Sequence, residues 1–199
     1  MKRMIGLFVG AAIAMAASAG NAMVVFSDNF DDGDVTDWVK STNYAGTTSV
    51  QTDGTAVSGQ SLFTYLTAPP GGTNLIVRAT KSFNAPVAGD YLLSLYAVST
   101  VCSGCTVSYD VLVDGMHLDR KNFTSGFEAR NFNLMGLSAG THSLILGVYT
   151  TNASSGLFGA RFDNVEVSTQ AEIPEASTLA ALAGGLTALG AGLVRRRHQ

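Results

Sequence analysis

Five aspartates crowd into ten residues near the start of the chain. They are Asp28, Asp31, Asp32, Asp34 and Asp37. Carboxylate oxygens are the ligands that Ca²⁺ takes in extracellular proteins. The spacing does not fit an EF-hand loop, because Phe30 and Val39 stand where that loop needs oxygen ligands. The cluster therefore indicates either a calcium site of another geometry or a solvated acidic loop with an ordinary turn.

A second chemistry, sugar binding, needs an exposed aromatic face with polar groups beside it for the hydroxyls. The candidate rings are Trp38, Tyr44, Tyr65, Tyr96 and Tyr149. Each could instead be an ordinary core residue. Tyr96 falls on the outer register of its expected strand, so it is the hardest to explain as core. Trp38 follows the acidic loop and is the second glycan candidate, with a buried ring as its alternative.

Catalysis has little support among the residues. The chain has three histidines; His198 belongs to the C-terminal tail, while His117 and His142 follow turns and are expected at the surface or at an edge. Neither a Gly-x-Ser-x-Gly elbow nor a His-Glu-x-x-His helix occurs in the sequence. Paired carboxylates for glycoside hydrolysis could be imagined anywhere in so acidic a domain. The sequence predicts a non-enzyme.

The N-terminus sets the compartment. Residues 1–22 carry Lys2 and Arg3, then an apolar stretch and small residues up to Ala22, which is the pattern of a secretory signal peptide. Five of the 12 basic residues lie in the two termini, so the exported part has seven basic against 15 acidic residues, a net charge of about −8. Such a surface argues against nucleic acid as a partner.

The two cysteines, Cys102 and Cys105, are spaced as Cys-x-x-Cys. In a cytosolic protein this spacing would suggest redox or metal chemistry. Here the compartment is oxidising, the chain has no second pair for zinc, and the motif joins two expected strands. A local disulfide that pins a turn is the favoured interpretation.

Residues 179–199 predict a membrane-spanning helix with an arginine-rich end. Residues 179–194 carry no charge, and with the two residues before them they give a helix of about 27 Å, enough for a thin hydrocarbon core. Arg195, Arg196 and Arg197 follow and would stay cytoplasmic, which leaves the rest of the chain outside.

Residues 171–178 form a linker that ends in Ile-Pro-Glu-Ala-Ser-Thr. Followed by an apolar helix and arginines, this order resembles the PEP-CTERM sorting tail of Gram-negative bacteria, which an exosortase is thought to process near its Pro-Glu-Pro motif. The resemblance implies that Pro174, Glu175, Ser177 and Thr178 form the sorting motif. Ala176 departs from the pattern, since the family usually has a second proline there. An ordinary single-pass anchor is the alternative.

Residues 23–170 alternate apolar and polar side chains with the period of two that is typical of strands. Strands are expected over residues 24–27, 47–52, 61–66, 74–83, 91–98, 107–113, 116–120, 127–134, 142–148 and 159–168. Residues 107–113 should bury one face only, and Asp114-Gly115 predicts the hairpin turn that follows them. Since no 3.6-residue stripe lies between the termini, the expected fold is an all-β, antiparallel two-sheet sandwich.

Short phrases at residues 28–38, 89–91, 109–115, 137–142 and 160–167 resemble those of the galactose-binding-like jelly rolls found in many carbohydrate-binding modules. The resemblance implies a jelly roll whose first and last strands lie side by side. It also implies a structural Ca²⁺ between the start of the domain and the last strand. Asp163 is the best match for a ligand there, with Asp28 its partner.

These observations together indicate an exported, non-enzymatic protein that passes through the Sec machinery and is sorted by an exosortase. It would be held in the inner membrane, transiently or permanently, and then reach the cell surface or the exopolysaccharide matrix of a Gram-negative bacterium. Glycan binding is the expected role of the sandwich. The alternatives are a structural matrix protein without a ligand site and, less favoured, a surface hydrolase.

Overall fold

The computed structural model of the chain describes residues 22–68, 73–100, 105–151 and 156–170. These residues belong to one compact unit, Ala22–Gln170. The expected signal peptide up to residue 21, the whole linker with its sorting motif, the apolar helix and the terminal arginines lie outside the described residues. In the part of the chain that is described, no helix has the length and apolar character needed to cross a membrane.

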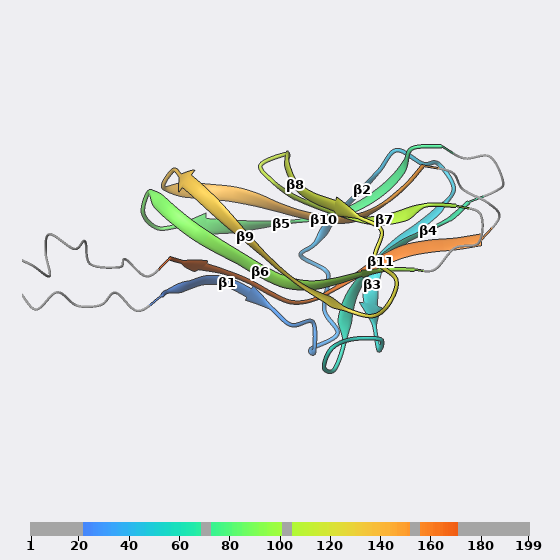
Figure 1. The fold of residues 1–199 in the computed structure, drawn as a ribbon, viewed down its shortest axis with the longest axis horizontal. Coiled ribbons are helices and arrows are strands. Elements are labelled where there is room, and N and C mark those ends of the chain that lie inside the picture. Colours follow the sequence, from blue (N-terminus) through green and yellow to red (C-terminus); the bar gives the residue numbers. More distant parts are fainter. Residues whose placement is uncertain (1–21, 69–72, 101–104, 152–155, 171–199) are drawn as a thin grey trace, which may run out of the picture. The chain divides into compact units, whose positions relative to one another are not determined.

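Eleven strands make up the described unit (Figure 1). They are β1 (Val24–Asp28), β2 (Val39–Thr42), β3 (Thr47–Asp53), β4 (Ser61–Ala68), β5 (Leu75–Ala85), β6 (Gly89–Ser99), β7 (Val107–Val113), β8 (Met116–Lys121), β9 (Glu128–Leu137), β10 (Gly140–Thr150) and β11 (Gly156–Thr169). The expectation of an all-β chain is confirmed for these residues. Strand β2 is the element that the sequence pattern did not indicate.

The strands form two antiparallel sheets that face each other. The six-stranded sheet has the order β3-β4-β11-β6-β9, with β1 also paired to β11, and the five-stranded sheet has the order β2-β5-β10-β7-β8. Strand β11 pairs with β4 along its first half and with β1 along its second half. The two-sheet sandwich is therefore confirmed, and the first and last strands lie side by side as expected.

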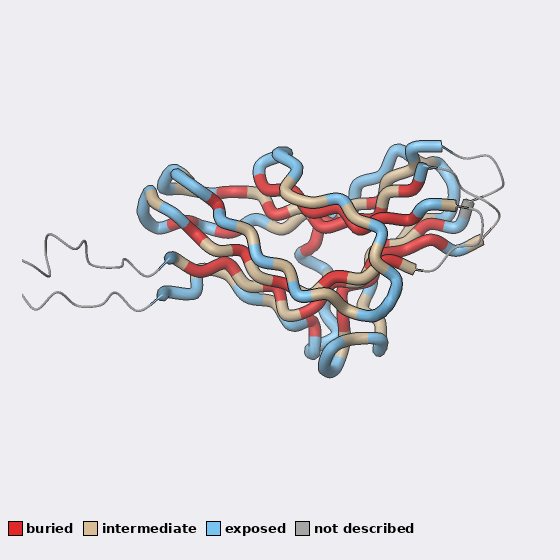
Figure 2. The backbone as a smooth tube through the Cα atoms, viewed as in Figure 1, coloured by how far each residue is buried: buried red, intermediate tan, exposed pale blue. Residues whose placement is uncertain are grey.

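The core lies between the sheets. Along β6, residues 91, 93, 95 and 97 are buried, and the residues between them are partly exposed. Figure 2 shows the same alternation of buried and more exposed positions on other long strands. Because successive strand side chains point to opposite faces, this alternation places one row of each strand in the core and the other on an outer face.

Strand β7 departs from that pattern. All seven of its residues are buried, including Ser108, Asp110 and Leu112 on the outer register. The expectation that residues 107–113 bury one face only is wrong. The reason is that the outer face of this strand is covered by long side chains from the neighbouring strands, which are described below.

The Asp114-Gly115 turn joins β7 to β8 as predicted. Both residues have positive φ, 50° and 78°, the backbone conformation that a two-residue hairpin of this type requires. The Asp114 carboxylate also accepts hydrogen bonds from the Ser143 backbone and from the His142 ring, at 2.8 and 2.6 Å. The β7–β8 turn is thereby fixed to the start of β10.

Candidate functional site

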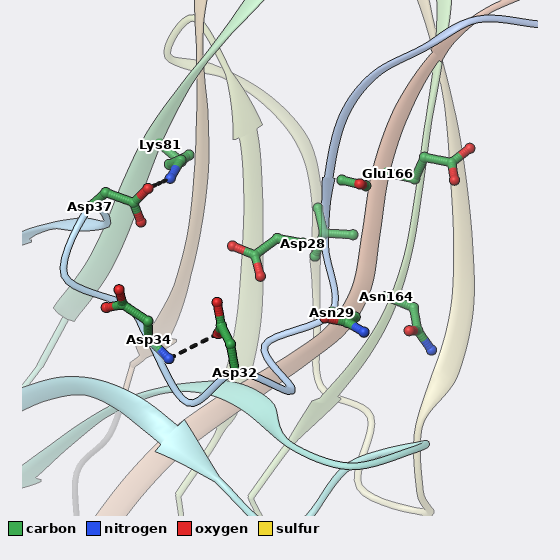
Figure 3. A pocket seen from close by; sticks show the side chains of 10 residues that line it. Asp28, Asn29, Asp32, Asp34, Asp37, Lys81, Asn164 and Glu166 are labelled. Carbon is green, nitrogen blue, oxygen red and sulfur yellow. Dashed lines mark hydrogen bonds and ion pairs between the residues drawn. The ribbon is translucent and has the colours of Figure 1, made fainter.

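The acidic loop after β1 borders a pocket of about 580 Å³ (Figure 3). The pocket is lined by Ser27, Asp28, Asn29, Asp32, Asp34, Asp37, Lys81, Asn164, Val165 and Glu166. Several of its carboxylates already serve the loop itself. Asp32 accepts the backbone N–H of Asp34 at 2.9 Å, and Asp37 forms an ion pair with Lys81. The backbone N–H of Thr36, which Asp34 accepts, lowers the pKa of the Asp34 carboxyl.

Asp28 holds the aromatic residues at the start of the domain. Its two carboxylate oxygens accept the Phe30 backbone N–H at 3.0 Å and the Trp38 indole N–H at 2.8 Å. Trp38 is 4% exposed and packs against the rings of Phe26 and Phe30. The buried alternative therefore applies to Trp38: its ring has no open face on which a sugar could stack.

Asp163 is fully buried and fixes the loop between β3 and β4. One of its oxygens accepts the backbone N–H groups of Val57 and Ser58, at 2.8 and 3.2 Å, and the other accepts that of Asn164 at 2.7 Å. It lies at the bulge where the β6–β11 pairing shifts register. This side chain is thus the hydrogen-bond acceptor for three backbone N–H groups of the loop and the bulge that would otherwise lack one.

The two carboxylates implied as calcium ligands are thus both occupied by protein donors. Asp28 lines the acidic pocket, whereas Asp163 does not. Among the described residues, no three side chains of the metal-binding types are grouped so that they could hold an ion. Calcium binding stays a prediction, and the arrangement of Asp28 and Asp163 does not favour a cation shared between them.

Tyr96 lies on the outer face of the six-stranded sheet, as its register predicted. It is partly exposed, and its cross-strand partners are Asp163 on β11 and Ala129 on β9. Its role as a glycan contact stays a prediction. Cys105 precedes β7 and is not a free thiol, but Cys102 lies outside the described residues, so the disulfide between them also stays a prediction.

The expectation that His142 lies at the surface or at an edge is wrong, because only 7% of it is exposed and β10 lies between β5 and β7. Its ring lies near the Phe83 ring, with centroids 5.5 Å apart, and its second nitrogen is 2.9 Å from the Ser138 carbonyl oxygen. The hydrogen bond to Asp114, followed by that to Ser138, raises the pKa of the imidazole. His142 is a structural residue that joins two turns.

A second polar arrangement lies on the outer face of the five-stranded sheet. We call it the Asp110 cluster, and it consists of Asp110, Arg78, Arg120, His117 and Tyr149. The Asp110 side chain is fully buried, while the two arginine side chains are 23% and 32% exposed. A buried carboxylate is costly unless it is paired and hydrogen-bonded, and this one has charged partners on both sides.

The two arginines hold Asp110 through four hydrogen bonds. Arg78 donates from Nε and Nη2 to one carboxylate oxygen, at 3.2 and 2.8 Å. Arg120 donates from Nε to the other oxygen at 3.1 Å and from Nη2 to the first at 3.2 Å. His117 Nδ1 lies 3.0 Å from the carboxylate, and its Nε2 lies 3.4 Å from Arg120. Because arginine only donates, the contact to Arg120 suits Nε2 as an acceptor, and Nδ1 then suits donation to the carboxylate.

Strand register assembles this cluster from four different strands. Arg78 on β5 is opposite Gly147 on β10, Gly147 is opposite Asp110 on β7, and Asp110 is opposite Arg120 on β8. Gly147 is required in this row, because a Cβ there would lie 2.6 Å from the Val77 carbonyl oxygen and 2.8 Å from Arg78 Cγ. The absence of a side chain at position 147 lets Arg78 cross the strand and reach Asp110.

The Tyr149 ring packs against the guanidinium of Arg120. The Arg120 guanidinium lies 3.8 Å from the centre of the Tyr149 ring, a cation–π distance, and the Tyr149 hydroxyl donates to Asn74 at 2.6 Å. Within the described structure, Nη1 of Arg78 and of Arg120 has no hydrogen-bond acceptor, and neither is a buried unsatisfied atom. Each guanidinium therefore keeps donor capacity beyond what Asp110 uses.

The sequence pattern missed this cluster. The alternation of side chains placed Asp110 on an outer register. It does not show that Asp110 lies beside Arg78, Gly147 and Arg120, because these residues are up to 69 positions apart along the chain. The sequence does contain a charged residue on an apolar strand and two arginines at outer positions of other strands. These three residues predict a cluster only when the order of the strands in the sheet is known.

Comparison with known proteins bears on the fold. No protein-family model and no curated protein sequence matches this chain. Among solved structures, TmCBM61 in complex with β-1,4-galactotriose matches with a TM-score of 0.51 and 12% identity, over 71% of this chain and 94% of its own. The domain resembles carbohydrate-binding modules in fold.

Two more binding modules match in the same way. TmCBM27, a mannan-recognising module, has a TM-score of 0.50 and 16% identity, over 76% of this chain and 99% of its own. The CBM22-1 xylan-binding domain of Xyn10C from Paenibacillus barcinonensis has a TM-score of 0.50 and 17% identity, over 79% of this chain and 100% of its own. Identities this low establish a shared architecture and do not transfer a ligand.

Proposed function

We propose that this protein is a non-enzymatic, exported glycan-binding protein whose binding face is the outer face of the five-stranded sheet at the Asp110 cluster. The observation that carries the proposal is the pair of guanidiniums held by a buried carboxylate, with spare donors and partial exposure. The resemblance in fold to modules that bind galactotriose, mannan and xylan supports a sugar as the ligand.

Rigidity is what makes this cluster suited to binding. Free arginine side chains lose rotamer freedom when they bind a ligand, which costs affinity. Here Arg78 is fixed by two hydrogen bonds and by its passage over Gly147, and Arg120 by two hydrogen bonds and the Tyr149 ring. The two guanidiniums would therefore lose little further freedom when a partner binds to their unused N–H groups.

The proposal includes the route that the termini indicate. A signal peptide over residues 1–22 would give Sec export, and the Pro-Glu motif, apolar run and three arginines of residues 173–199 would make the chain an exosortase substrate. In a Gram-negative host with an exosortase, we expect the protein in the surface or matrix fraction. Replacing Arg195, Arg196 and Arg197 with Gln should shift it among fractions, and an unchanged distribution would contradict the sorting proposal.

Affinity electrophoresis of the Ala22–Gln170 unit tests the glycan-binding role. The gels contain xylan, mannan, β-1,4-galactan, alginate or polygalacturonate, and we expect retardation in at least one of them. Arg120→Gln should reduce that retardation. Arg161→Gln is the matched control, because Arg161 is also paired with a carboxylate and stacked on an aromatic ring, but on the other sheet. Unretarded migration in every gel would favour the structural matrix protein instead.

A further inference from the structure

The basic side chains of the described unit differ in how many carboxylates they contact. The unit holds seven of them: Lys40, Arg78, Lys81, Arg120, Lys121, Arg130 and Arg161. Lys81 pairs with Asp37, and Arg161 with Asp53. Lys121 and Arg130 share two carboxylates, those of Asp119 and Glu128. Lys40 reaches a backbone carbonyl oxygen.

Two arginines share a single carboxylate only at the Asp110 cluster, among the residues that the structure describes. Asp110 neutralises one of the two guanidinium charges. The two arginines and Asp110 together therefore carry a net charge of about +1. The outer register of the same sheet offers no other acidic side chain nearby, since Asp114 lies in the turn and is engaged by His142 and Ser143.

The rest of the surface has the opposite sign. The exported part as a whole is acidic, and the pocket beside β1 is lined by five carboxylates and one lysine. A polyanion would be repelled from that pocket and attracted to the Asp110 cluster, because surface potentials of one sign steer ligands of the other. The positive charge of the cluster therefore favours an anionic ligand at this face.

We infer that the Asp110 cluster binds the carboxylate of an acidic glycan, with a uronate residue against Arg78 and Arg120. This inference rests on the glycan-binding role proposed above and narrows it to one ligand class. The geometry fits, because each guanidinium has a free Nη1 donor beside the bonds that Asp110 already receives. Carboxylate–guanidinium hydrogen bonds are shorter and stronger than those to neutral sugar hydroxyls.

The direct test changes the ligand and leaves the protein intact. Calorimetry compares polygalacturonate with the same polymer after its carboxyl groups have been reduced to alcohols, using both the full chain in mild detergent and the Ala22–Gln170 unit. We expect the uronate polymer to bind at least about tenfold more tightly, the effect of one charge-assisted hydrogen bond. We also expect that preference to shrink between 20 mM and 500 mM NaCl, since salt screens an exposed pair.

Two variants locate the effect on the protein. Arg120→Gln and Arg78→Gln should each remove most of the preference for the uronate polymer, whereas Arg161→Gln should keep it. Arg161 is a fair control because its guanidinium lies 4.1 Å from the Phe63 ring, as Arg120 lies over Tyr149. Near-ultraviolet circular dichroism of each variant shows whether it is folded, and the comparison of the two polymers on wild-type protein does not depend on any variant.

The outcomes separate the inference from the function on which it rests. Equal binding of the two polymers would overturn the uronate inference and keep the glycan-binding role. Binding of a neutral polysaccharide alone would do the same. Failure to bind any polymer would overturn both. A uronate preference that survives both Arg78→Gln and Arg120→Gln would place acidic-glycan binding elsewhere and overturn the assignment of the site.

Discussion

Replacement of Asp110 by Asn tests whether a buried charge organises the outer face of the five-stranded sheet. Asp110 accepts four hydrogen bonds from two guanidiniums and a fifth contact from His117. Asparagine has nearly the same shape but keeps only one oxygen acceptor, and its NH₂ group faces arginine donors. The substitution therefore removes the charge and half of the acceptors without leaving a cavity.

The expected loss of unfolding free energy is about 3 kcal/mol. Hydrogen bonds to a charged group contribute about 1.5–3 kcal/mol each, but they do not simply add here. Arg78 and Arg120 are 23% and 32% exposed, so each can turn partly toward water when its partner is lost. An ordinary domain has a free energy of unfolding of about 5–15 kcal/mol, so a loss of about 3 kcal/mol would be a large part of it.

The assay is urea unfolding of the Ala22–Gln170 unit, followed by the fluorescence of the single tryptophan, Trp38, which is buried. Asp53→Asn is the matched control. Asp53 pairs with one arginine at 3.1 Å, and both side chains are partly exposed, so we expect it to cost about 1 kcal/mol. If Asp110→Asn cost no more than Asp53→Asn, the argument that Asp110 organises the face would be refuted.

Three further predictions concern single contacts. The raised pKa of His142 means that its bond to Asp114 contributes fully below about pH 6.5 and is lost as pH rises through the folded-state pKa. The urea midpoint should therefore fall between pH 6 and 9, and His142→Gln should flatten that slope; an equal slope in the variant would contradict this role. Gly147→Ala should cost about 2 kcal/mol, because its Cβ would meet the Val77 carbonyl oxygen at 2.6 Å, and a wild-type melting temperature would contradict the close approach. Burial, followed by the hydrogen bond to Asp119, raises the pKa of Tyr109, so its hydroxyl stays a donor to the carboxylates of Asp119 and Glu128. Tyr109→Phe should therefore cost about 1–2 kcal/mol in the same urea assay, and no measurable loss would count against this role.

Local sequence patterns predicted most of the architecture. Period-two alternation located ten of the strands, because a half-buried strand must alternate its side chains, and Asp114-Gly115 gave the turn, because only small or Asx residues tolerate positive φ there. The sequence did not predict strand β2, and the physical reason is the same. All four of its residues are exposed, so it shows no buried row.

The proposed binding face could not be predicted in the same way. Asp110 looked like an ordinary outer-register residue because its burial comes from the arginines of other strands, and strand order is a property of the whole sheet. Trp38 is a different case: the sequence left a ligand contact and a buried ring both open, and the low exposure of the ring and its N–H bond to Asp28 decide for the buried ring. Strand pairing across the sheet decides the case of Asp110, and contacts among residues 26–38 decide that of Trp38.

The central claim is that an acidic glycan binds at Arg78 and Arg120, and an NMR titration tests it most directly. The arginine Nε–H signals of the ¹⁵N-labelled Ala22–Gln170 unit are followed while trigalacturonate is added. The Arg78 and Arg120 signals should shift together and saturate, while those of Arg130 and Arg161 stay in place. Shifts confined to Arg130 and Arg161, or no shift at any arginine, would contradict the claim.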